Sequence, residues 1–288
     1  MTTLVSLWTD IRRRLEAEGV DSPVLDARML IEKGAEVRRL DIVTDPRREM
    51  TEAQIAGVEA LVARRLAREP ISHIIGRKGF WTLEFAVTPD VLTPRPDTEL
   101  LVEAGLEFLP PDKPARVLDL GVGSGVVLLT VLSERPLAEG VGVDLSEAAL
   151  TVARANGAAL DLNSRIDWRA GDWGAGLEGP FDLILSNPPY IASAEIETLA
   201  PEVAKFEPRL ALDGGADGLD AYRALMPQIR ALLAPGGRFA LEVGKGQAQA
   251  VWALADAAGL QPLDVRADLA GVDRVVTGRR RELLLGDH

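Results

Sequence analysis

The sequence predicts an α/β protein whose main domain is a doubly wound, mostly parallel sheet of seven strands. Three observations lead to this prediction. From Arg116 onward, short apolar strands alternate with helical stretches, as in parallel sheets covered by helices. In residues 1–75, by contrast, apolar side chains recur at helical spacing. A length of 288 residues also exceeds one typical hydrophobic core, so two domains are expected.

Residues 1–75 are expected to form a small all-helical domain. Apolar residues recur every three or four positions between residues 4 and 15. Ser22 and Pro23 are typical of a helix N-cap and first turn, so a second helix begins there. Residues 51–54 match a capping box and predict the start of a third helix.

Residues 76–110 are expected to link the two domains. The stretch 80–87 is aromatic and partly alternating, and a turn at residues 89–90 leads to a second short strand, which together predict a β-hairpin. The proline-rich stretch that follows is rigid. Asp97 or Thr98 is expected to cap the next helix.

Residues 111–288 are expected to hold the doubly wound domain. Ligands of such sheets bind at the carboxyl ends of the strands, so functional residues are expected at that edge. The predicted strands cover residues 116–120, 140–144, 165–170, 181–186, 238–243, 262–266 and 274–278. The main predicted helices cover residues 126–134, 147–160, 221–233 and 247–258.

The composition argues against several kinds of site. The chain has no cysteine, which excludes disulfides, thiolate nucleophiles and cysteine-ligated metals. Its histidines are His73 and His288 alone, which argues against a His-rich metal site or a Ser-His-Asp triad. We therefore expect no metal cofactor.

The charge of the chain is unevenly distributed. Residues 1–78 carry a net charge of +1, whereas residues 79–288 carry −13. Such an acidic main domain argues against direct binding to nucleic-acid phosphates. No run reaches the roughly 18 apolar residues of a membrane span, and the N-terminal stretch lacks the charge order of a secretory signal. The expected location is cytoplasmic, without membrane association.

A glycine-rich loop follows the first strand of the main domain. Three glycines in five residues allow a nucleotide-like ligand to approach the backbone closely. The spacing differs from the dinucleotide-binding fingerprint, because position 126 is Val, and the loop lacks the Lys-Ser/Thr pair of a triphosphate P-loop. The residues expected to contact the ligand here are Gly121, Val122, Gly123, Ser124 and Gly125.

Acidic residues end the next two strands. Asp144 lies 23 residues after Gly121, where a carboxylate can accept both ribose hydroxyls of an adenosyl group, although it can also cap the following helix. Asp172 can accept an adenine amino group, and Trp173 offers a flat apolar wall; a surface turn around a buried Trp is the alternative. The loop and Asp144 together predict an adenosyl-binding site.

The fourth strand is followed by Asn187-Pro188-Pro189-Tyr190. An amide or exocyclic amine nitrogen is a poor nucleophile, because its lone pair is delocalised. The Asn187 side-chain oxygen can accept one N–H of an –NH2 group and the Pro188 carbonyl the other, which turns the lone pair toward a methyl carbon. The prolines stiffen the segment and Tyr190 offers a stacking face. The tetrapeptide thus predicts methylation of an –NH2 group, although Asn-Pro also marks ordinary turns.

Together these residues resemble the class I S-adenosylmethionine-dependent methyltransferases, and specifically the PrmC/HemK family of release-factor glutamine methyltransferases. The resemblance covers nearly the whole chain. It departs from the family where Val122 and Ser124 replace residues that are often Thr, and in residues 267–275. Further stretches that are similar to the family are 69–76, 80–81, 93–99, 172–173, 206–209 and 211–212.

The resemblance implies a Rossmann-like class I methyltransferase domain with a reversed last strand. It implies methyl transfer from S-adenosyl-L-methionine to the side-chain amide nitrogen (N5) of the glutamine in the Gly-Gly-Gln motif of class I peptide-chain release factors. The other product is S-adenosyl-L-homocysteine. By matching motif positions, residues 121–125, Asp144 and Trp173 contact the cofactor. Asn187 then faces both cofactor and substrate, and the other three residues of the tetrapeptide complete the glutamine pocket.

An Asn-Pro-Pro-Tyr site also serves enzymes that methylate adenine N6 or cytosine N4 in nucleic acids, which is the main alternative. The acidic main domain argues against it. A noncatalytic binding module is disfavoured because Asp144 and Asn187 are both present. A nicotinamide dehydrogenase is disfavoured by the glycine spacing.

The roles of three further features are expectations. Residues 1–75 are expected to dock a second surface of the release factor, because one glutamine side chain offers few hydrogen bonds; mere stabilisation of the catalytic unit is the alternative. His73 is expected to be structural, because the reaction needs no base. Arg95 can reach a ligand carboxylate or form an interdomain salt bridge.

Overall fold

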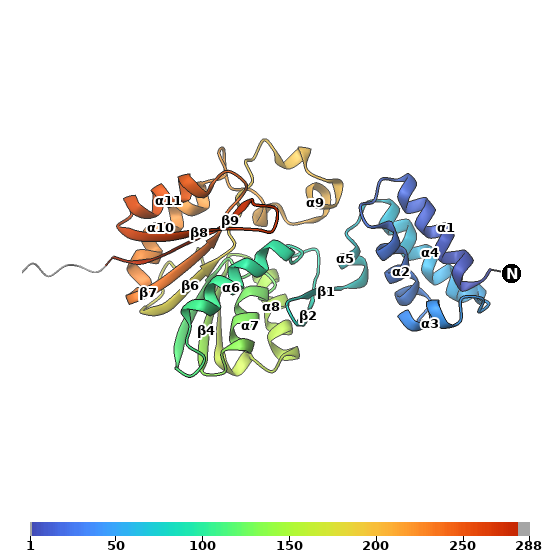
Figure 1. The fold of residues 1–288 in the computed structure, drawn as a ribbon, viewed down its shortest axis with the longest axis horizontal. Helices are drawn as coiled ribbons and strands as arrows, with labels where there is room; N and C mark the ends of the chain where they lie inside the picture. Colours follow the sequence, from blue (N-terminus) through green and yellow to red (C-terminus); the bar gives the residue numbers. More distant parts are fainter. Residues whose placement is uncertain (1, 282–288) are drawn as a thin grey trace, which may run out of the picture. The chain divides into compact units, whose positions relative to one another are not determined.

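The computed structural model describes residues 2–281, which divide into two compact units (Figure 1). One unit comprises Met1–Arg77 together with Ala200–Phe206. The other comprises Lys78–Leu199 and Glu207–His288. The chain therefore passes from one unit to the other three times along its length.

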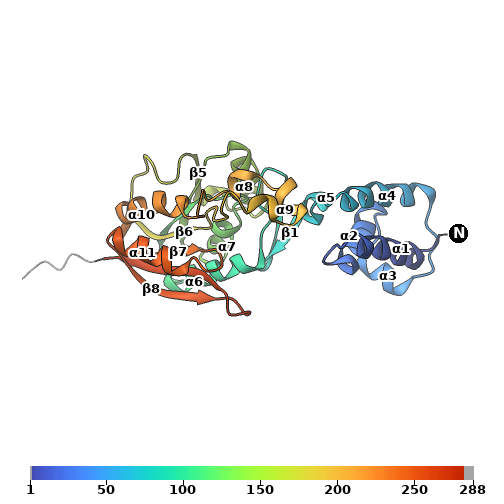
Figure 2. The same ribbon diagram turned by 90° about the horizontal axis from the view of Figure 1, so that it is seen from above.

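The first unit is helical. It contains the three predicted helices, α1 (Leu4–Ala17), α2 (Pro23–Gly34) and α4 (Glu52–Leu66). Figure 2 shows α1, α2 and α3 gathered on one side of α4. Both α1 and α4 begin with a capping box, the second of which is the predicted one at Thr51. The core residues of this unit are apolar and fully buried, among them Leu4, Ile11, Leu15, Leu30, Ile31, Val58 and Val62.

Two short helices of residues 1–77 were not predicted. Helix α3 (Arg39–Thr44) buries none of its residues, so it lacks the apolar periodicity that would reveal it. Helix α5 (Ile71–Ile75) is too short for such a pattern, although most of it, including His73, is buried. It ends at Gly76, whose φ of 81° requires the left-handed conformation that favours glycine.

Glycines allow α2 and α4 to pack closely. A Cβ atom on Gly57 would lie 2.5 Å from the carbonyl oxygen of Gly34, and one on Gly34 would lie 2.6 Å from the Cα of Val58. Neither distance is sterically possible without movement of the backbone. The helix crossing therefore depends on the absence of side chains at both glycines.

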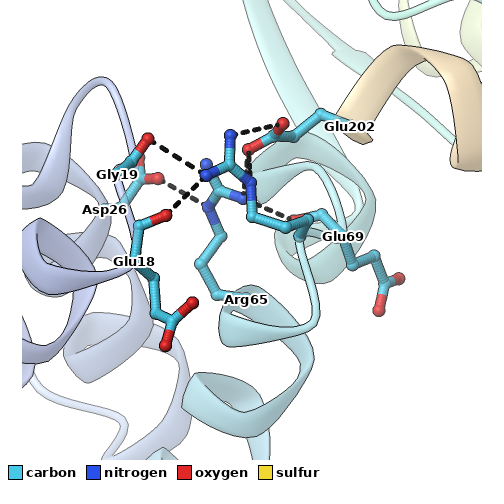
Figure 3. A network of polar contacts seen from close by, with 7 residues as sticks. Glu18, Gly19, Asp26, Arg65, Glu69 and Glu202 are labelled. Carbon is cyan, nitrogen blue, oxygen red and sulfur yellow. Dashed lines mark hydrogen bonds and ion pairs between the residues drawn. The ribbon is translucent and has the colours of Figure 1, made fainter. Parts of the chain in front are cut away.

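A buried ion-pair network joins α9 (Pro201–Phe206) to the helices of the first unit (Figure 3). The Arg65 side chain is 6% exposed, and its Nε lies 2.7 Å from Oδ2 of Asp26 in α2. One of its terminal nitrogens lies 2.9 Å from Glu202 of α9, which also pairs with Arg68. Arg68 in turn donates to the carbonyl oxygens of Glu18 and Gly19.

The hairpin occurs earlier in the chain than predicted. Its strands are β1 (Arg77–Phe80) and β2 (Leu83–Ala86), so the prediction of a turn at residues 89–90 with a second strand beyond it is wrong. Trp81 makes the actual turn by adopting a positive φ of 56°, and its indole nitrogen donates to Glu134. A bulky residue seldom adopts this conformation, so the sequence gives no turn signal there.

The second unit contains the predicted seven-stranded sheet, in the order β5-β4-β3-β6-β7-β9-β8 (Figure 1). Strands β3 to β7 pair in parallel, and β9 is antiparallel to both of its neighbours, which confirms the reversed last strand. The strands are β3 (Ala115–Leu120), β4 (Ala138–Asp144), β5 (Ile166–Ala170), β6 (Phe181–Ser186), β7 (Leu233–Glu242), β8 (Leu260–Ala267) and β9 (Asp273–Arg280).

Helices cover both faces of this sheet. Helices α6 and α7 contribute to one apolar cluster and α10 and α11 to another, so the sheet lies between two cores. The helices of this unit are α6 (Glu99–Phe108), α7 (Val126–Glu134), α8 (Glu147–Ala159), α10 (Asp220–Leu232) and α11 (Ala248–Ala257). Short 3-10 turns are η1 (Pro96–Thr98), η2 (Asn163–Arg165), η3 (Ile196–Thr198) and η4 (Arg209–Ala211).

The strand order reverses between β3 and β6. The chain adds β4 and β5 on one side of β3, and it adds β6 and the later strands on the other. At such a switch point the loops after the two central strands diverge and leave a crevice at the carboxyl edge of the sheet. The glycine-rich loop follows β3 and the Asn187 segment follows β6, so the fold brings both to this crevice.

The buried ion pair predicts a large effect of one substitution in the helical unit. Asp26→Ala leaves the guanidinium of Arg65 buried without this carboxylate, which should lower the free energy of unfolding by about 3–5 kcal/mol. Hydrogen exchange of the α2 and α4 amides measures the effect. Asp10→Ala is the matched control, because Asp10 pairs with Arg14 on the surface and should contribute less than about 1 kcal/mol. Equal protection in both variants would contradict the assignment.

Candidate active site

A cavity of about 520 Å³ lies at the carboxyl edge of the sheet, within the second unit. Its lining includes the loops after β3, β4, β5 and β6, together with residues 89–92, 94–95, 208, 210–211 and 213. A second cavity, of about 630 Å³, is lined by the amino ends of the strands, near Arg116 and Phe181, and by none of the predicted site residues. The predicted site residues in the first cavity are Gly121, Val122, Gly123, Ser124, Asp144, Asp172, Trp173, Asn187 and Pro189.

The glycine-rich loop leaves its backbone open to this cavity. Gly121, Gly123 and Gly125 all have positive φ, between 54° and 82°. A Cβ on Gly121 would approach the Trp173 ring to 3.2 Å, so the missing side chain lets this ring lie against the loop. Nothing lies within 4 Å of the Cβ position of Gly123, which leaves room for a ligand. Gly125 packs against Leu129 and forms the N-cap of α7.

Asp144 joins the glycine-rich loop to the loop that follows β4. Its Oδ2 accepts the backbone N–H of Gly123 at 2.8 Å, and its Oδ1 accepts that of Ser146 at 2.9 Å. Burial raises the pKa of the Asp144 carboxyl above its usual value, and these N–H groups oppose the rise. Ser146, and not Asp144, caps α8 with its side chain. A carboxylate retains further acceptor capacity, so Asp144 can still accept two vicinal hydroxyls.

Asp119 is a buried carboxyl group that the sequence analysis missed. It lies near the end of β3, contributes to the lining of the cavity and accepts the N–H of Leu128. Burial raises the pKa of Asp119 to about 7, and the nearby Asp144 adds to the rise. A single polar residue in the otherwise apolar stretch 117–120 was the available signal.

The Asn187 amide lies in the cavity lining with its orientation set by a threonine. Its Nδ2 donates to the hydroxyl oxygen of Thr98 at 3.3 Å, which leaves Oδ1 available as an acceptor. Pro189 also contributes to the lining, whereas Pro188 and Tyr190 are not among the described residues that line this cavity. Thr98 had been considered only as a helix cap, and its side chain makes no cap hydrogen bond.

Tyr190 is mostly buried, and its hydroxyl donates to Oε1 of Glu242 at 3.3 Å. Burial, reinforced by the carboxylate, raises the pKa of Tyr190 far above its usual value, so the phenol remains protonated. Its backbone carbonyl accepts a hydrogen bond from the Gln247 side chain. These contacts fix the last residue of the tetrapeptide.

Arg95 pairs with a residue of its own unit. Its terminal nitrogen lies 2.6 Å from the buried carboxylate of Glu207, and both residues belong to the second unit. The same arginine contributes to the lining of the cavity. Arg95 therefore forms a salt bridge within one unit, and not the interdomain salt bridge that was one of the two expectations.

Residues 2–281 contain neither a candidate metal cluster nor a candidate membrane span. No group of three or more His, Cys, Asp or Glu side chains placed to hold a metal ion occurs in that part of the chain. None of its helices is long and apolar enough to cross a membrane.

Family models match both parts of the chain. The PrmC N-terminal domain matches residues 6–76, and the methyltransferase small domain matches residues 96–207. A methyltransferase of Pyrococcus furiosus shares the fold, with a TM-score of 0.52 and 17% identity over 77% of this chain and 97% of that one. The 16S rRNA N2 G1207 methyltransferase of Thermus thermophilus does so with a TM-score of 0.50 and 23% identity, over 71% of this chain and 50% of that one.

The fold and these matches define a class I methyltransferase. The release factor glutamine methyltransferase of Caulobacter vibrioides is 53% identical over 98% of both chains. That of Rhodospirillum rubrum is 48% identical over 93% of this chain and 82% of its own. The chain belongs to the release factor glutamine methyltransferase family, which confirms the resemblance of its motifs.

The position of Asp144 predicts a role in cofactor affinity. Asp144→Asn should weaken the binding of S-adenosyl-L-methionine by about 1.5–3 kcal/mol, because charge-assisted hydrogen bonds to the ribose hydroxyls are lost. Calorimetric titration measures the affinity, and circular dichroism checks the fold. Asp167→Asn is the control, since Asp167 is exposed and lies outside this cavity. Unchanged affinity in a folded Asp144→Asn protein would reject the role.

Proposed function

We propose that the protein transfers the methyl group of S-adenosyl-L-methionine to the N5 amide nitrogen of the glutamine in the Gly-Gly-Gln motif of class I peptide-chain release factors. The observation that carries the proposal is the Asn187 amide, held in the cavity lining with its Nδ2 on Thr98. The relatives that share nearly the full length are named for glutamine methylation of release factors, which supports this substrate. Such a substrate also favours a cytoplasmic location.

The cavity fits the proposed cofactor. The open backbone at Gly123, the carboxylate of Asp144 and the Trp173 ring line one cavity of about 520 Å³, as an adenosyl group requires. We assign residues 121–125 and Asp144 to the cofactor's nucleoside, together with the Asp172-Trp173 pair. When bound, the cofactor supplies an electrophilic methyl group on a sulfonium. We propose that no metal takes part.

The residues of the tetrapeptide orient the nucleophile. Oδ1 of Asn187 accepts one N–H of the substrate amide, and the carbonyl oxygen of Pro188 accepts the other. Both acceptors draw the amide hydrogens to one side, so the nitrogen lone pair faces the methyl carbon. The N–C bond forms as the S–C bond breaks, and the electron pair of the S–C bond remains on sulfur. The methylated nitrogen then loses a proton. No residue needs to act as a base before the attack.

The substrate assignment is tested by methyl transfer from labelled S-adenosyl-L-methionine. Release factor should accept the label, whereas its variant with the motif glutamine replaced, and duplex DNA, should not. Asn187→Ala should lower kcat by roughly 10²–10³, by analogy with the loss of an oxyanion-hole donor, while cofactor affinity stays within about twofold. Asn163→Ala is the control, because Asn163 bonds to Trp168 away from the cavity.

Two results would contradict this account. Label on DNA but not on release factor would favour a nucleic-acid amino-group methyltransferase. A wild-type rate of single-turnover methylation by Asn187→Ala would show that its amide does not orient the nucleophile.

We further propose that residues 1–75 dock the release factor. One glutamine side chain offers few contacts, so recognition of a whole protein requires a second surface. The helical unit carries a groove of about 520 Å³ on α1, α2 and α3, in which apolar side chains are exposed beside two arginines. Its exposed apolar residues include Leu25 and Val43. A partner with apolar side chains and nearby acidic groups fits this surface.

Substitution of that groove predicts a split between two substrates. Leu25→Glu with Val43→Glu should raise KM for intact release factor about tenfold or more, because apolar contact is lost and a buried charge is introduced. A short Gly-Gly-Gln peptide lacks the rest of the release factor, so the variant should methylate it as the wild type does. Leu263→Glu on β8 is the control. Equal kinetics of both proteins on the intact factor would disprove docking at this groove.

A further inference from the structure

The carboxyl group of Glu242 is buried directly behind the tetrapeptide, and the proposed reaction does not use it. Glu242 ends β7, and its side chain is almost fully enclosed, with 2% of the residue exposed. Strand β7 pairs in parallel with β6 up to Ser186, so Glu242 stands level with Asn187 on the next strand. A carboxyl group is seldom buried unless other groups compensate for its desolvation.

Two hydroxyl groups reach this carboxylate. The Tyr190 hydroxyl donates to its Oε1. The Thr98 hydroxyl also lies beside it, and both hydroxyls favour its ionised form. Thr98 is the residue whose oxygen accepts Nδ2 of Asn187. Asn187 donates to Thr98, so the one proton of Thr98 is left for the neighbouring Glu242 carboxylate, whose buried Oε2 accepts no hydrogen bond from residues 2–281.

The direction of this chain decides how the Asn187 amide points. A threonine hydroxyl has one proton, and if that proton is donated to a carboxylate, the oxygen is left to accept from Asn187. Nδ2 of Asn187 then faces Thr98, and Oδ1 is free to accept from the substrate. If Thr98 instead donated to Asn187, the amide would turn over and present N–H groups to the substrate –NH2, where no hydrogen bond can form.

We propose that Glu242, acting through Thr98, is a positioning residue that holds the Asn187 amide with its acceptor oxygen toward the substrate. The orientation is a property of the protein alone. Only its kinetic consequence rests on the proposed glutamine methylation.

The ionisation of Glu242 makes the orientation depend on pH. Burial raises the pKa of Glu242 to about 7. Below that pH the protonated carboxyl group can itself donate to Thr98, and Thr98 can then donate to Asn187, so the productive orientation is lost. Other titratable or charged groups that act on Glu242 or its phenol partner come from three elements and two loops. They are Asp97 in η1, Tyr222 in α10, Arg274 in β9, Tyr190 after β6 and Arg95 before η1.

Kinetics of matched variants test the proposal. Glu242→Gln and Thr98→Val should each lower kcat by about 10- to 100-fold, because the amide is no longer held in one orientation. KM for release factor and the affinity for S-adenosyl-L-methionine should stay within about twofold. Thr98→Ser retains the hydroxyl and should restore most of kcat. Thr130→Val, which removes a buried hydroxyl bonded within α7, is the control for packing damage.

A spectroscopic readout is independent of methylation. The chain contains three asparagines, Asn156, Asn163 and Asn187, so a protein labelled with ¹⁵N at the asparagine side chains gives three NH2 signals. The Asn187 pair is identified by its loss in Asn187→Asp. In the wild type it should shift between pH 6 and 8 with a midpoint near 7, and in Glu242→Gln it should not. Asp119 titrates in both proteins, so the difference isolates Glu242.

The outcomes separate this proposal from the proposed function. An Asn187 signal that does not move with pH in the wild type, or wild-type kcat in folded Glu242→Gln and Thr98→Val, would overturn the positioning role. If a variant does not fold, the titration of the wild type and the kinetics of Thr98→Ser still decide, since loss of kcat in Thr98→Ser would also overturn it. A protein that shows the predicted titration but does not methylate release factor would refute the function and leave the positioning role intact.

Discussion

The reversal of strand order between β3 and β6 is the constraint on which the rest of the site depends. Parallel strands end at the same edge of a sheet, and only at the reversal do the loops after two neighbouring strands diverge enough to leave a cavity between them. The glycine-rich loop on one side and the Asn187 segment on the other thereby line one cavity. Asp144 then binds the backbone of the glycine-rich loop and gives it a fixed shape.

The site contains two buried carboxyl groups that accept hydrogen bonds from neighbouring groups. Asp119 and Glu242 are both enclosed, and burial raises the pKa of each to about 7. Neither carboxyl group makes an ion pair within residues 2–281, and each accepts a hydrogen bond from a neighbouring backbone or hydroxyl group. An ion pair would compensate the burial more fully, but hydrogen bonds to backbone and hydroxyl groups fix a direction as well as a distance.

Much of this molecule could be predicted from its sequence, and the failures have identifiable physical causes. Strands such as β6 and helices such as α7 follow from apolar runs bounded by glycine or proline, and their bounds match the prediction. The hairpin was misplaced because Trp81 adopts a positive φ that its side chain disfavours. The sequence does not show that α9 belongs to the helical unit. Glu202 and Arg65 lie 137 positions apart, and no local pattern indicates that they pair.

Two side chains of the cavity lining, Asp144 and Asn187, were predictable, whereas Asp119 and Thr98 line the same cavity and were missed. Asp144 and Asn187 end or follow strands, so their positions at the ligand edge follow from the fold. Thr98 and Glu242 act through a second residue, and their roles depend on contacts between η1, β6 and β7 that no local pattern encodes. A polar residue at a buried position near the end of a strand is the sequence feature that can point to residues of this kind.

The most direct test of the account is a structure of the protein with S-adenosyl-L-homocysteine and a Gly-Gly-Gln peptide. The account predicts that the glutamine amide nitrogen lies about 3 Å from both Oδ1 of Asn187 and the carbonyl oxygen of Pro188, with Nδ2 of Asn187 still on Thr98. A glutamine side chain bound elsewhere, or one whose carbonyl oxygen and not its nitrogen faces Asn187, would contradict it.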